Sequence, residues 1–328
     1  MEEKIEIMNL LQDKQLLEHE LETIVYGSVE IREVDSKKYI YVHYREDGVL
    51  LTKYVGEYSD ELYNLILNNS IKAKEIKKQI KDIVKKLKQL NYVEDELTEK
   101  VEQNIDFAKR HLVDTIYKQA ILEGVATTFA DTESIIEGGK VNNMTSEDVL
   151  KIINLKHAWE FILNKNVILS DTNFALLCEI NKIVEQGFYY TAGKIRNVPV
   201  TIGGTTWKPD FPIESKIKEE LEEILKRNLD DVDTAIELLL YTMKKQIFID
   251  GNKRTSVIYS NHYLISRGKG IIVIPAELTD EFKDLLILYY EGRDEKEIKR
   301  FIKEKCYMSI WRVIRKYYKK ILFSDCYV

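Results

Sequence analysis

The stretch Gln246-Ile-Phe-Ile-Asp-Gly-Asn-Lys-Arg-Thr255 lies between two segments with helical periodicity in this 328-residue chain. Before it, apolar residues recur at the spacing of one helix face: Ala235, Ile236, Leu239, Leu240 and Met243. After it, Thr255 to Ser266 again predicts a helix, which Gly268 ends. The stretch is therefore predicted to be a tight loop between two helices, the second of which begins near Asn252.

Several features of this loop suit a phosphate group. A helix start leaves backbone N–H groups unpaired and carries the positive end of the helix dipole. Gly251 has no Cβ and lets a ligand approach the backbone, while Lys253 and Arg254 add positive charge. Asp250 supplies a carboxylate that can hold Mg²⁺. The pattern fits a cradle for nucleotide phosphates, and the alternative from the residues alone is an ordinary solvated helix start.

The loop resembles the signature of the Fic family, His-x-Phe-x-Asp/Glu-Gly-Asn-Gly/Lys-Arg. The matching residues are Phe248, Asp250, Gly251, Asn252, Lys253 and Arg254. Fic proteins transfer part of a nucleotide, usually AMP from ATP, to a protein hydroxyl. Where the family places its catalytic His, this chain has Gln246.

The resemblance implies a role for each residue of the loop. Gln246, Asp250 and Arg254 take the catalytic positions, and Asp250 is the metal ligand for Mg²⁺. Phe248 and the run from Gly251 to Arg254 bind ATP. A glutamine amide is not basic, so we expect slow transfer with binding retained. One sequence does not tell whether Gln246 is natural or introduced.

A glycine-rich segment from Tyr189 to Pro212 alternates like a β-hairpin. Its runs Ala192-Gly-Lys-Ile-Arg196 and Val200-Thr-Ile-Gly-Gly204 resemble the Fic flap, which pairs with an extended stretch of the target protein. The resemblance implies target docking by six residues: Lys194, Ile195, Arg196, Thr201, Ile202 and Gly203. The alternative is a hairpin with a purely structural role.

A third match, Thr132-Glu-Ser-Ile-Ile-Glu-Gly138, resembles the inhibitory helix of some Fic proteins and predicts such a helix over 131–138. The resemblance implies that Glu137, with Ser134 in the same motif, restrains activity. The arginine that the family pairs with this glutamate falls at Val257, so Lys253 or Arg254 would have to replace it. An ordinary surface glutamate is the alternative.

The composition disfavours several classes of binding partner. The net charge of −6 disfavours nucleic acid, and three dispersed cysteines favour neither a disulfide framework nor a metal site. The chain shows no signal peptide and no apolar run of membrane-spanning length. We therefore expect a cytoplasmic protein without a membrane partner, and a homo-oligomer stays open.

The first 95 residues predict a small α+β domain. A helix over residues 1–20 precedes three β-rich runs between Ile24 and Tyr58, which turns at Asp35-Ser-Lys-Lys and Glu46-Asp-Gly48 join into a meander. A lysine-rich helix follows from Ser59 to Leu90. The meander is either a structural sheet or a recognition module, and the lysines form either a solvated face or a basic patch.

Beyond residue 100 the chain predicts helices near 100–123, 131–138, 145–164, 171–186, 213–228, 232–246, 252–267, 276–291 and 293–320. The predicted fold is mainly α: a Fic-type helical domain with a β-hairpin flap over 96–300, a preceding α+β domain over 1–95, and a C-terminal helical extension over 301–328. The implied function is transfer of AMP from ATP to a Ser, Thr or Tyr hydroxyl of a target protein. The alternatives are Doc-like transfer of phosphate, suggested by Lys253, and a nucleotide-binding pseudoenzyme that acts through a partner.

Overall fold

The computed structural model describes residues 2–35, 37–46, 49–90, 92, 97–142 and 144–312. Its contacts divide the chain into two compact units, Met1–Val93 and Glu94–Val328. The predicted domain boundary between residues 95 and 96 and the part of the predicted C-terminal extension after residue 312 lie outside the described residues. Among the described helices, none combines the length and the apolar character needed to cross a bilayer.

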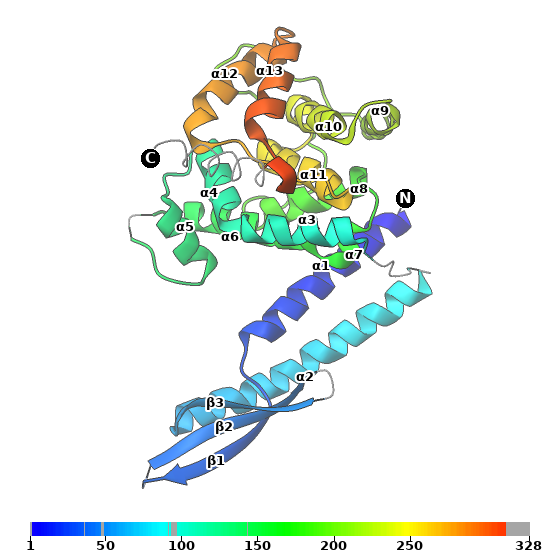
Figure 1. Ribbon diagram of the computed structural model, residues 1–328. Coiled ribbons are helices and arrows are strands. Elements are labelled where there is room, and N and C mark those ends of the chain that lie inside the picture. Colours follow the sequence, from blue (N-terminus) through cyan, green and yellow to red (C-terminus); the bar gives the residue numbers. More distant parts are fainter. Residues whose placement is uncertain are drawn as a thin grey trace, which may run out of the picture. The chain divides into compact units, whose positions relative to one another are not determined.

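The first unit confirms the predicted meander. Its elements are α1 (Glu2–Thr23), β1 (Ser28–Val34), β2 (Lys37–Glu46), β3 (Val49–Glu57) and α2 (Asp60–Gln89). The strands form one antiparallel sheet in the order β1-β2-β3 (Figure 1). Ser59 starts α2 by accepting a hydrogen bond from the backbone N–H of Leu62 at 3.1 Å. The predicted turns include Ser36, Asp47 and Gly48, which lie outside the described residues.

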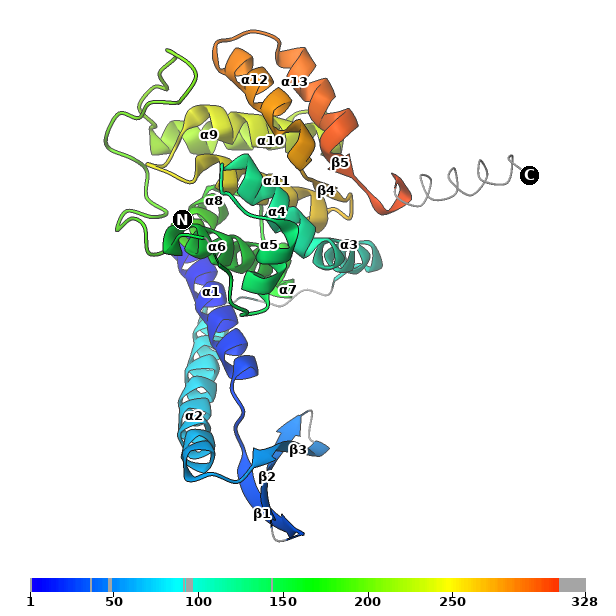
Figure 2. The same ribbon diagram turned by 90° about the vertical axis from the view of Figure 1, so that its left-hand side faces the viewer.

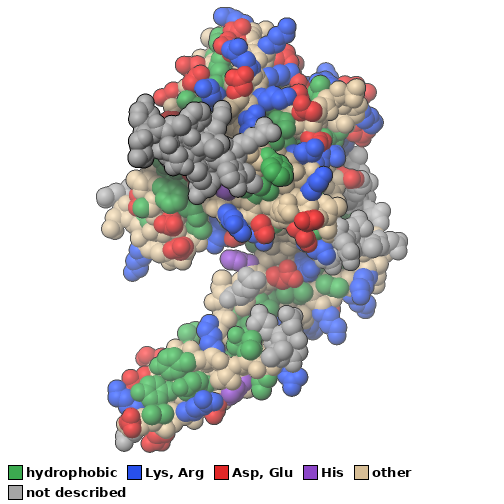
Figure 3. All heavy atoms as spheres, in the orientation of Figure 1, with side chains coloured by type: hydrophobic (Ala, Val, Ile, Leu, Met, Phe, Trp, Pro, Cys, Tyr) green, Lys and Arg blue, Asp and Glu red, His purple; other side chains and the backbone are tan. Residues whose placement is uncertain are grey.

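The sheet uses its two faces differently. Ile40 and Val42 of β2 are fully buried with Ile66 of α2, which is the burial that strand alternation predicts. The opposite face carries an aromatic cluster in which the Tyr54 ring lies 5.5 Å from Tyr41 and 6.2 Å from Tyr39. Figure 3 shows hydrophobic side chains gathered over the sheet among charged ones. One face therefore forms the core of this unit, and the other is accessible.

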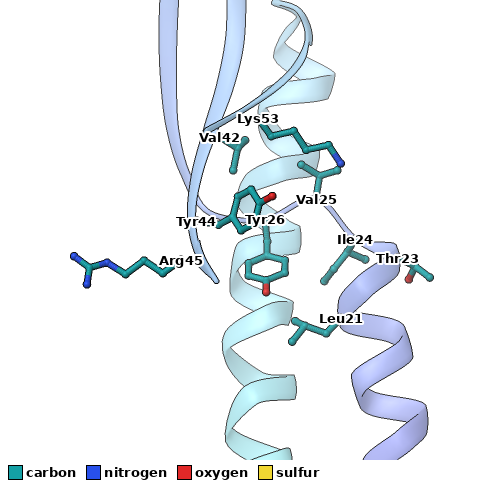
Figure 4. A pocket seen from close by; sticks show the side chains of 9 residues that line it. All are labelled: Leu21, Thr23, Ile24, Val25, Tyr26, Val42, Tyr44, Arg45 and Lys53. Atoms are coloured by element: carbon teal, nitrogen blue, oxygen red, sulfur yellow. The ribbon is translucent and has the colours of Figure 1, made fainter. Parts of the chain in front are cut away.

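A cavity of about 340 Å³ lies where α1 leads into β1. Residues of α1, of the connection 24–26, of β2 and of β3 line it: Leu21, Thr23, Ile24, Val25, Tyr26, Val42, Tyr44, Arg45 and Lys53. Tyr26 and Tyr44 are both among the lining residues, and Arg45 points away from the other side chains (Figure 4). The cavity is thus mainly apolar and aromatic, and Arg45 contributes to its edge.

The second unit is helical. Its helices are α3 (Glu99–Arg110), α4 (Leu112–Leu122), α5 (Phe129–Ile136), α6 (Ser146–Leu163), α7 (Lys165–Ile168), α8 (Phe174–Val184), α9 (Glu214–Lys226), α10 (Asp231–Lys245), α11 (Asn252–Ser266), η1 (Ala276–Leu278), α12 (Thr279–Tyr290), α13 (Glu295–Phe301) and η2 (Ile302–Cys306). Two short strands, β4 (Ile271–Ile272) and β5 (Tyr307–Met308), pair antiparallel.

Helix α11 is the centre of this unit, because it packs against α10, α8, α6 and α3. Most of its polar residues are buried as well. His262 shares hydrogen bonds with Thr172 Oγ1 at 2.9 Å and with the backbone carbonyl of Val167 at 2.9 Å. Burial lowers the pKa of His262 to about 4, so the ring is neutral and structural at pH 7.

Two predicted helices are wrong in extent. The segment near 100–123 is two helices that meet at His111. The single helix predicted over 293–320 ends at Cys306, because Tyr307 and Met308 pair with Ile272 and Ile271 instead. The backbone groups of β4 take their partners from β5, and helical periodicity does not report such a long-range pairing.

Candidate functional site

The loop between α10 and α11 has a defined backbone conformation. Gln246 ends α10 in the left-handed region with φ 47°, and Gly251 precedes α11 with φ 73°. The Asn252 side chain closes the loop: its Oδ1 accepts from Phe248 N–H at 3.0 Å, and its Nδ2 donates to Phe248 O at 2.9 Å. The predicted tight loop and the helix start at Asn252 are confirmed.

The Gln246 side chain points back into the protein. Its Nε2 donates to the carbonyl of Met243 at 2.7 Å, and its Oε1 accepts from Asn252 Nδ2 at 3.3 Å. Both ends of the amide are therefore engaged, and an amide has no proton-accepting basicity near neutral pH. At the position of the family's catalytic His, the chain carries a group that orders the loop.

Arg254 is the centre of the charge cluster at this loop. Its side chain is only 3% exposed, and its Nη2 lies 2.9 Å from Glu185 Oε1. The Nε atom lies 3.5 Å from Glu123 Oε2, and the same Glu123 carboxylate is 3.5 Å from Lys253 Nζ. Two carboxylates from α4 and α8 termini thus converge on the cations that follow Gly251.

Several buried polar atoms of this cluster have no hydrogen bond to a described residue. Both carboxylate oxygens of Glu185 and the Nε and Nη1 atoms of Arg254 are buried without a hydrogen bond to any described residue. The 2.9 Å approach of Arg254 to Glu185 is an ion pair without hydrogen-bond alignment. Buried polar atoms are normally satisfied, so these atoms have hydrogen-bonding capacity that a bound group could use.

Glu185 is electrostatically unusual. Burial raises the pKa of its carboxyl to about 7, and the neighbouring charge of Arg254 offsets only part of this increase. The Asp250 and Glu123 carboxylates raise the pKa further. Near neutral pH, Glu185 therefore changes between its neutral and its ionised form.

Asp250 differs from the two glutamates because its side chain is 52% exposed. Its Oδ1 accepts a hydrogen bond from Gly251 N–H at 2.6 Å and lies 3.6 Å from Arg254 Nη2. An accessible carboxylate is a ligand type that Mg²⁺ prefers. The sequence-predicted metal residue is thus in a position to bind a cation from solvent.

Buried amides hold the loop in place. Asn181 of α8 donates to Asp250 O and to Thr255 Oγ1, both at 3.1 Å, and its Oδ1 accepts from Gly193 N–H at 2.9 Å. Gln119 of α4 donates to Arg254 O at 2.9 Å. Neither amide was among the predicted site residues. Each lies on the buried stripe of its helix, where a polar residue between apolar ones is the signal.

The predicted flap is present as a loop. Residues 185–213 contain no strand, and Figure 2 shows the segment between α8 and α9 as an extended coil. Arg196 takes the place of strand pairing: its guanidinium donates to Gln246 O at 2.6 Å, Val198 O at 2.9 Å and Asp210 O at 2.6 Å. The predicted hairpin is wrong, because one buried cation holds both arms.

The predicted docking residues therefore separate into two groups. Arg196 is 3% exposed and satisfied internally, so it is a clamp and has no free surface for a target. Lys194, Thr201 and Gly203 are exposed, and Ile195 and Ile202 are half-buried. The accessible part of the segment has no strand pairing within the described residues.

The predicted inhibitory helix forms as α5, and Glu137 is its exposed C-terminal cap residue. Ser134 is half-buried. The expected pairing of Glu137 with Lys253 or Arg254 is wrong for this structure, because both cations lie against Glu123 instead. The C-terminus of α4, one helix earlier in the chain, supplies the carboxylate.

Comparisons with known proteins place this site in a family domain. Residues 171–264 match the Fic/DOC family. The fold resembles a fragment of Fic-1 from C. elegans that carries one substitution, with 17% identity, a TM-score of 0.54 and 77% of each chain covered. The same fragment without the substitution gives 16% identity and a TM-score of 0.50, covering 74% of this chain and 79% of that one. No curated protein matches by sequence. The mainly helical Fic-type fold is confirmed.

Proposed function

From the Fic/DOC family domain at residues 171–264, we propose that the chain transfers the AMP part of ATP to a protein hydroxyl, and that Gln246 makes this transfer weak. The observation that supports it best is Arg254. Its guanidinium is buried at the start of α11 with two nitrogens that lack hydrogen bonds to described residues. A buried donor of this kind suits a phosphate oxygen.

The donor set fits ATP and Mg²⁺. Arg254 and the backbone N–H groups at the start of α11 would hold phosphate oxygens, and the accessible carboxylate of Asp250 would hold Mg²⁺. When bound, ATP supplies the electrophilic α-phosphorus with pyrophosphate as leaving group, and Mg²⁺ offsets their charge. Phe248 is buried and orders the loop through Asn252.

The two buried glutamates oppose a phosphate unless one is neutral. Glu185 is well suited to this, because burial places the pKa of its carboxyl at about 7. With Glu185 protonated, Arg254 retains a net positive field for the incoming anion. With Glu185 ionised, the site already holds its own carboxylate against Arg254.

Proton removal from the target hydroxyl is the step that this chain lacks. A histidine at position 246 could accept that proton near pH 7, whereas the Gln246 amide cannot and is also bonded to Met243 and Asn252. Loss of general-base catalysis costs roughly a hundred- to ten-thousandfold in rate. Loss of the general base does not weaken ATP binding.

Target docking and restraint are part of the same proposal. The accessible backbone of the 194–203 segment would pair with an extended stretch of the target that presents Ser, Thr or Tyr. Glu137, at the exposed end of α5, would restrain activity.

Two alternative functions are each supported by one observation. Lys253 stands where many family signatures have glycine, which favours Doc-like transfer of phosphate. The inward hydrogen bonds of Gln246 favour a nucleotide-binding pseudoenzyme.

Labelling with ATP that carries ³²P at either the α or the γ position separates the three functions. We would incubate the wild type and Gln246→His with a protein mixture. Label from the α position supports AMP transfer, and label from the γ position alone supports phosphate transfer. Tight ATP binding without label from either position supports the pseudoenzyme. Absence of ATP binding would contradict all three.

A further inference from the structure

A second cavity lies in the helical unit, between α9, α10, α12 and the segment 207–213. Its volume is about 370 Å³. Aromatic rings and lysines dominate its lining: Trp207, Phe211, Tyr241, Tyr289, Lys216, Lys244 and Lys245, with Pro209, Asp210, Pro212, Ile213, Ile217 and Glu220. Helices α9 and α10 lie side by side in both ribbon views (Figures 1 and 2). None of the predicted site residues lines this cavity.

Lys244 gives the cavity its charge. Its Nζ lies 4.7 Å from the Tyr289 ring centroid and 5.8 Å from that of Trp207, and it donates to Tyr289 O at 2.8 Å. Among the described residues, no carboxylate forms an ion pair with it, although Glu295 acts on it from a greater distance. Burial lowers the pKa of Lys244. The ammonium is held by rings and one carbonyl, which leaves its charge uncompensated.

The other charges of the lining are already paired or exposed. Glu220 accepts from Tyr241 at 2.6 Å and forms an ion pair with Lys245 at 2.6 Å. Asp210 and Lys216 are exposed at the edge. The cavity therefore offers one half-buried cation, Lys244, with which no described carboxylate forms an ion pair. Set among aromatic walls, it complements an anionic group on an otherwise apolar ligand.

The rim of the cavity is apolar and accessible. Phe211 is 58% exposed and Ile213 is 60% exposed. Trp207 is held in place on the opposite side by stacking on Tyr290, with ring centroids 5.4 Å apart and an interplanar angle of 22°. An apolar side chain that covered Phe211 and Ile213 would bury surface that is now wet.

The cavity is joined to the catalytic loop through Arg196. This guanidinium donates to Gln246 O at the start of the loop and to Asp210 O in the cavity wall, both at 2.6 Å. Its Cζ also lies 5.4 Å from the Phe211 ring centroid. The Arg196 side chain thus connects the wall of the cavity to Gln246, the residue at the position of the general base.

We propose that this cavity docks an acidic residue and a neighbouring apolar residue of the target polypeptide. The target carboxylate would pair with Lys244, and the apolar side chain would cover Phe211 and Ile213. The inference rests on the proposed function, since it concerns the protein that carries the modified hydroxyl. A nucleotide fits less well, because no glycine lines this cavity and the helix start that does, that of α9, carries Glu214 in its first turn, whereas Gly251 precedes α11.

Methyl NMR can test this docking without catalysis. The protein would be labelled at isoleucine δ1-methyl groups, so that Ile213 and Ile217 report the cavity and Ile247 and Ile249 report the loop. The probes are the peptides acetyl-Asp-Leu-Ser-amide and acetyl-Asn-Leu-Ser-amide, titrated to about 10 mM because short peptides bind weakly. We expect the Asp peptide to shift Ile213 and Ile217 and to bind about fivefold more tightly than the Asn peptide.

The matched variants are Lys244→Met and Lys216→Met, which both remove an ammonium from the lining. Lys244→Met should weaken the Asp peptide about fivefold and bring it level with the Asn peptide, because the lost charge is the uncompensated one. Lys216→Met should change affinity less than about twofold, since its ammonium is exposed and screened. Unchanged methyl resonances elsewhere would verify that both variants are folded.

Four results would overturn the proposal: no shift of Ile213 and Ile217 with the Asp peptide, equal affinity for both peptides, equal effects of both variants, or movement of these two methyls with ATP. Shifts that depend only on protein concentration would assign the cavity to a second copy and also overturn it. Failure of the proposed function would give a different NMR result. ATP would then not shift the methyl resonances of Ile247 and Ile249, while the peptides would still shift those of Ile213 and Ile217.

Discussion

Gly251 and Glu185 lie so close together that a larger residue in place of the glycine would displace the Glu185 side chain. A Cβ at Gly251 would lie 3.0 Å from Glu185 Cδ and closer still to Oε1. Gly251 also has φ 73°, a conformation that costs energy for residues with a side chain. The carboxylate that contacts Arg254 is thus placed directly against the loop backbone.

Gly251→Ala should destabilise the protein by about 2–3 kcal/mol, from the backbone cost plus the forced movement of Glu185. Chemical denaturation measures this loss. Gly292→Ala is the matched control, because Gly292 has φ 81° but no heavy atom within 4 Å of the added Cβ. It should cost only about 1 kcal/mol. Equal losses in the two variants would show that Glu185 does not crowd the loop.

The raised pKa of Glu185 predicts a pH-dependent stability. The folded pKa is about 7 against an ordinary value of 4.5, so the folded state holds a proton that the unfolded state has released. Stability from this group is therefore complete below pH 4.5 and decreases as the pH rises from 4.5 through 7. Glu185→Gln cannot ionise, so the decrease should be absent in that variant.

His262 contributes the opposite slope over nearly the same range. Its folded pKa of about 4 lies below its ordinary 6.5, so its contribution is complete above pH 6.5 and decreases as the pH falls to 4. The wild-type curve is the sum of both terms and is flatter than either. The test is the difference in unfolding free energy between wild type and Glu185→Gln. A difference that is constant from pH 5 to 7.5 would contradict the buried titration.

Much of the loop could be predicted from sequence, and its carboxylate partners could not. Gly251, Asn252 and the helix start follow from local chemistry, which acts over a few residues. Glu123 and Glu185 reach Arg254 only after α4 and α8 pack on α11. A signal exists for Glu123: Ile116, Gln119 and Ala120 are buried, and Glu123 continues their stripe at i+7. An acid on a buried stripe indicates a distant cation, but the pattern does not identify which one.

The misread flap has a related cause. Residues 192–204 alternate and are rich in glycine, which locally resembles a hairpin. Strand pairing competes with the Arg196 guanidinium for the same carbonyls, and the buried cation prevails because leaving it unpaired would cost more than a short ladder gains. The predicted position of the segment follows from the motif, whereas its backbone pairing depends on where one side chain lies.

Arg196→Lys should loosen the whole segment between Arg196 and Asp210. Lysine keeps the charge but cannot donate to three separate carbonyls in a planar arrangement. We expect a loss on the order of 3 kcal/mol in unfolding free energy and faster hydrogen exchange for amides of residues 197–210. Arg293→Lys, at an exposed site paired with Glu291, should change neither. Unchanged exchange in Arg196→Lys would show that the clamp is not what orders the segment.

ATP with Mg²⁺ should raise the melting temperature of the wild type, because a ligand that binds only the folded state stabilises it. Arg254→Gln should remove most of that increase. The increase is measured within each variant, so that differences in stability between the variants cancel.

Glu185→Gln should increase ATP affinity most above pH 7, where the wild-type carboxylate is ionised. Isothermal calorimetry at pH 6 and pH 8 measures this. Equal affinity gains at both pH values would separate ATP binding from Glu185 ionisation.

Gln246→His tests whether the loop is a complete catalytic site except for its base. Asn252 Nδ2 already donates toward the side chain at position 246, so an imidazole there would have a neighbour that orients it. We expect self-labelling from α-³²P ATP that is at least about a hundredfold above wild type, since general-base catalysis supplies about that factor. The rate should rise with pH through the pKa of the new base. Gln246→Asn is the control, because it changes the side chain without adding basicity and should stay at the wild-type level. If Gln246→Asn labels as well as Gln246→His, the gain comes from freeing the loop and not from proton transfer. If neither labels while both bind ATP, the domain binds nucleotide without transferring AMP.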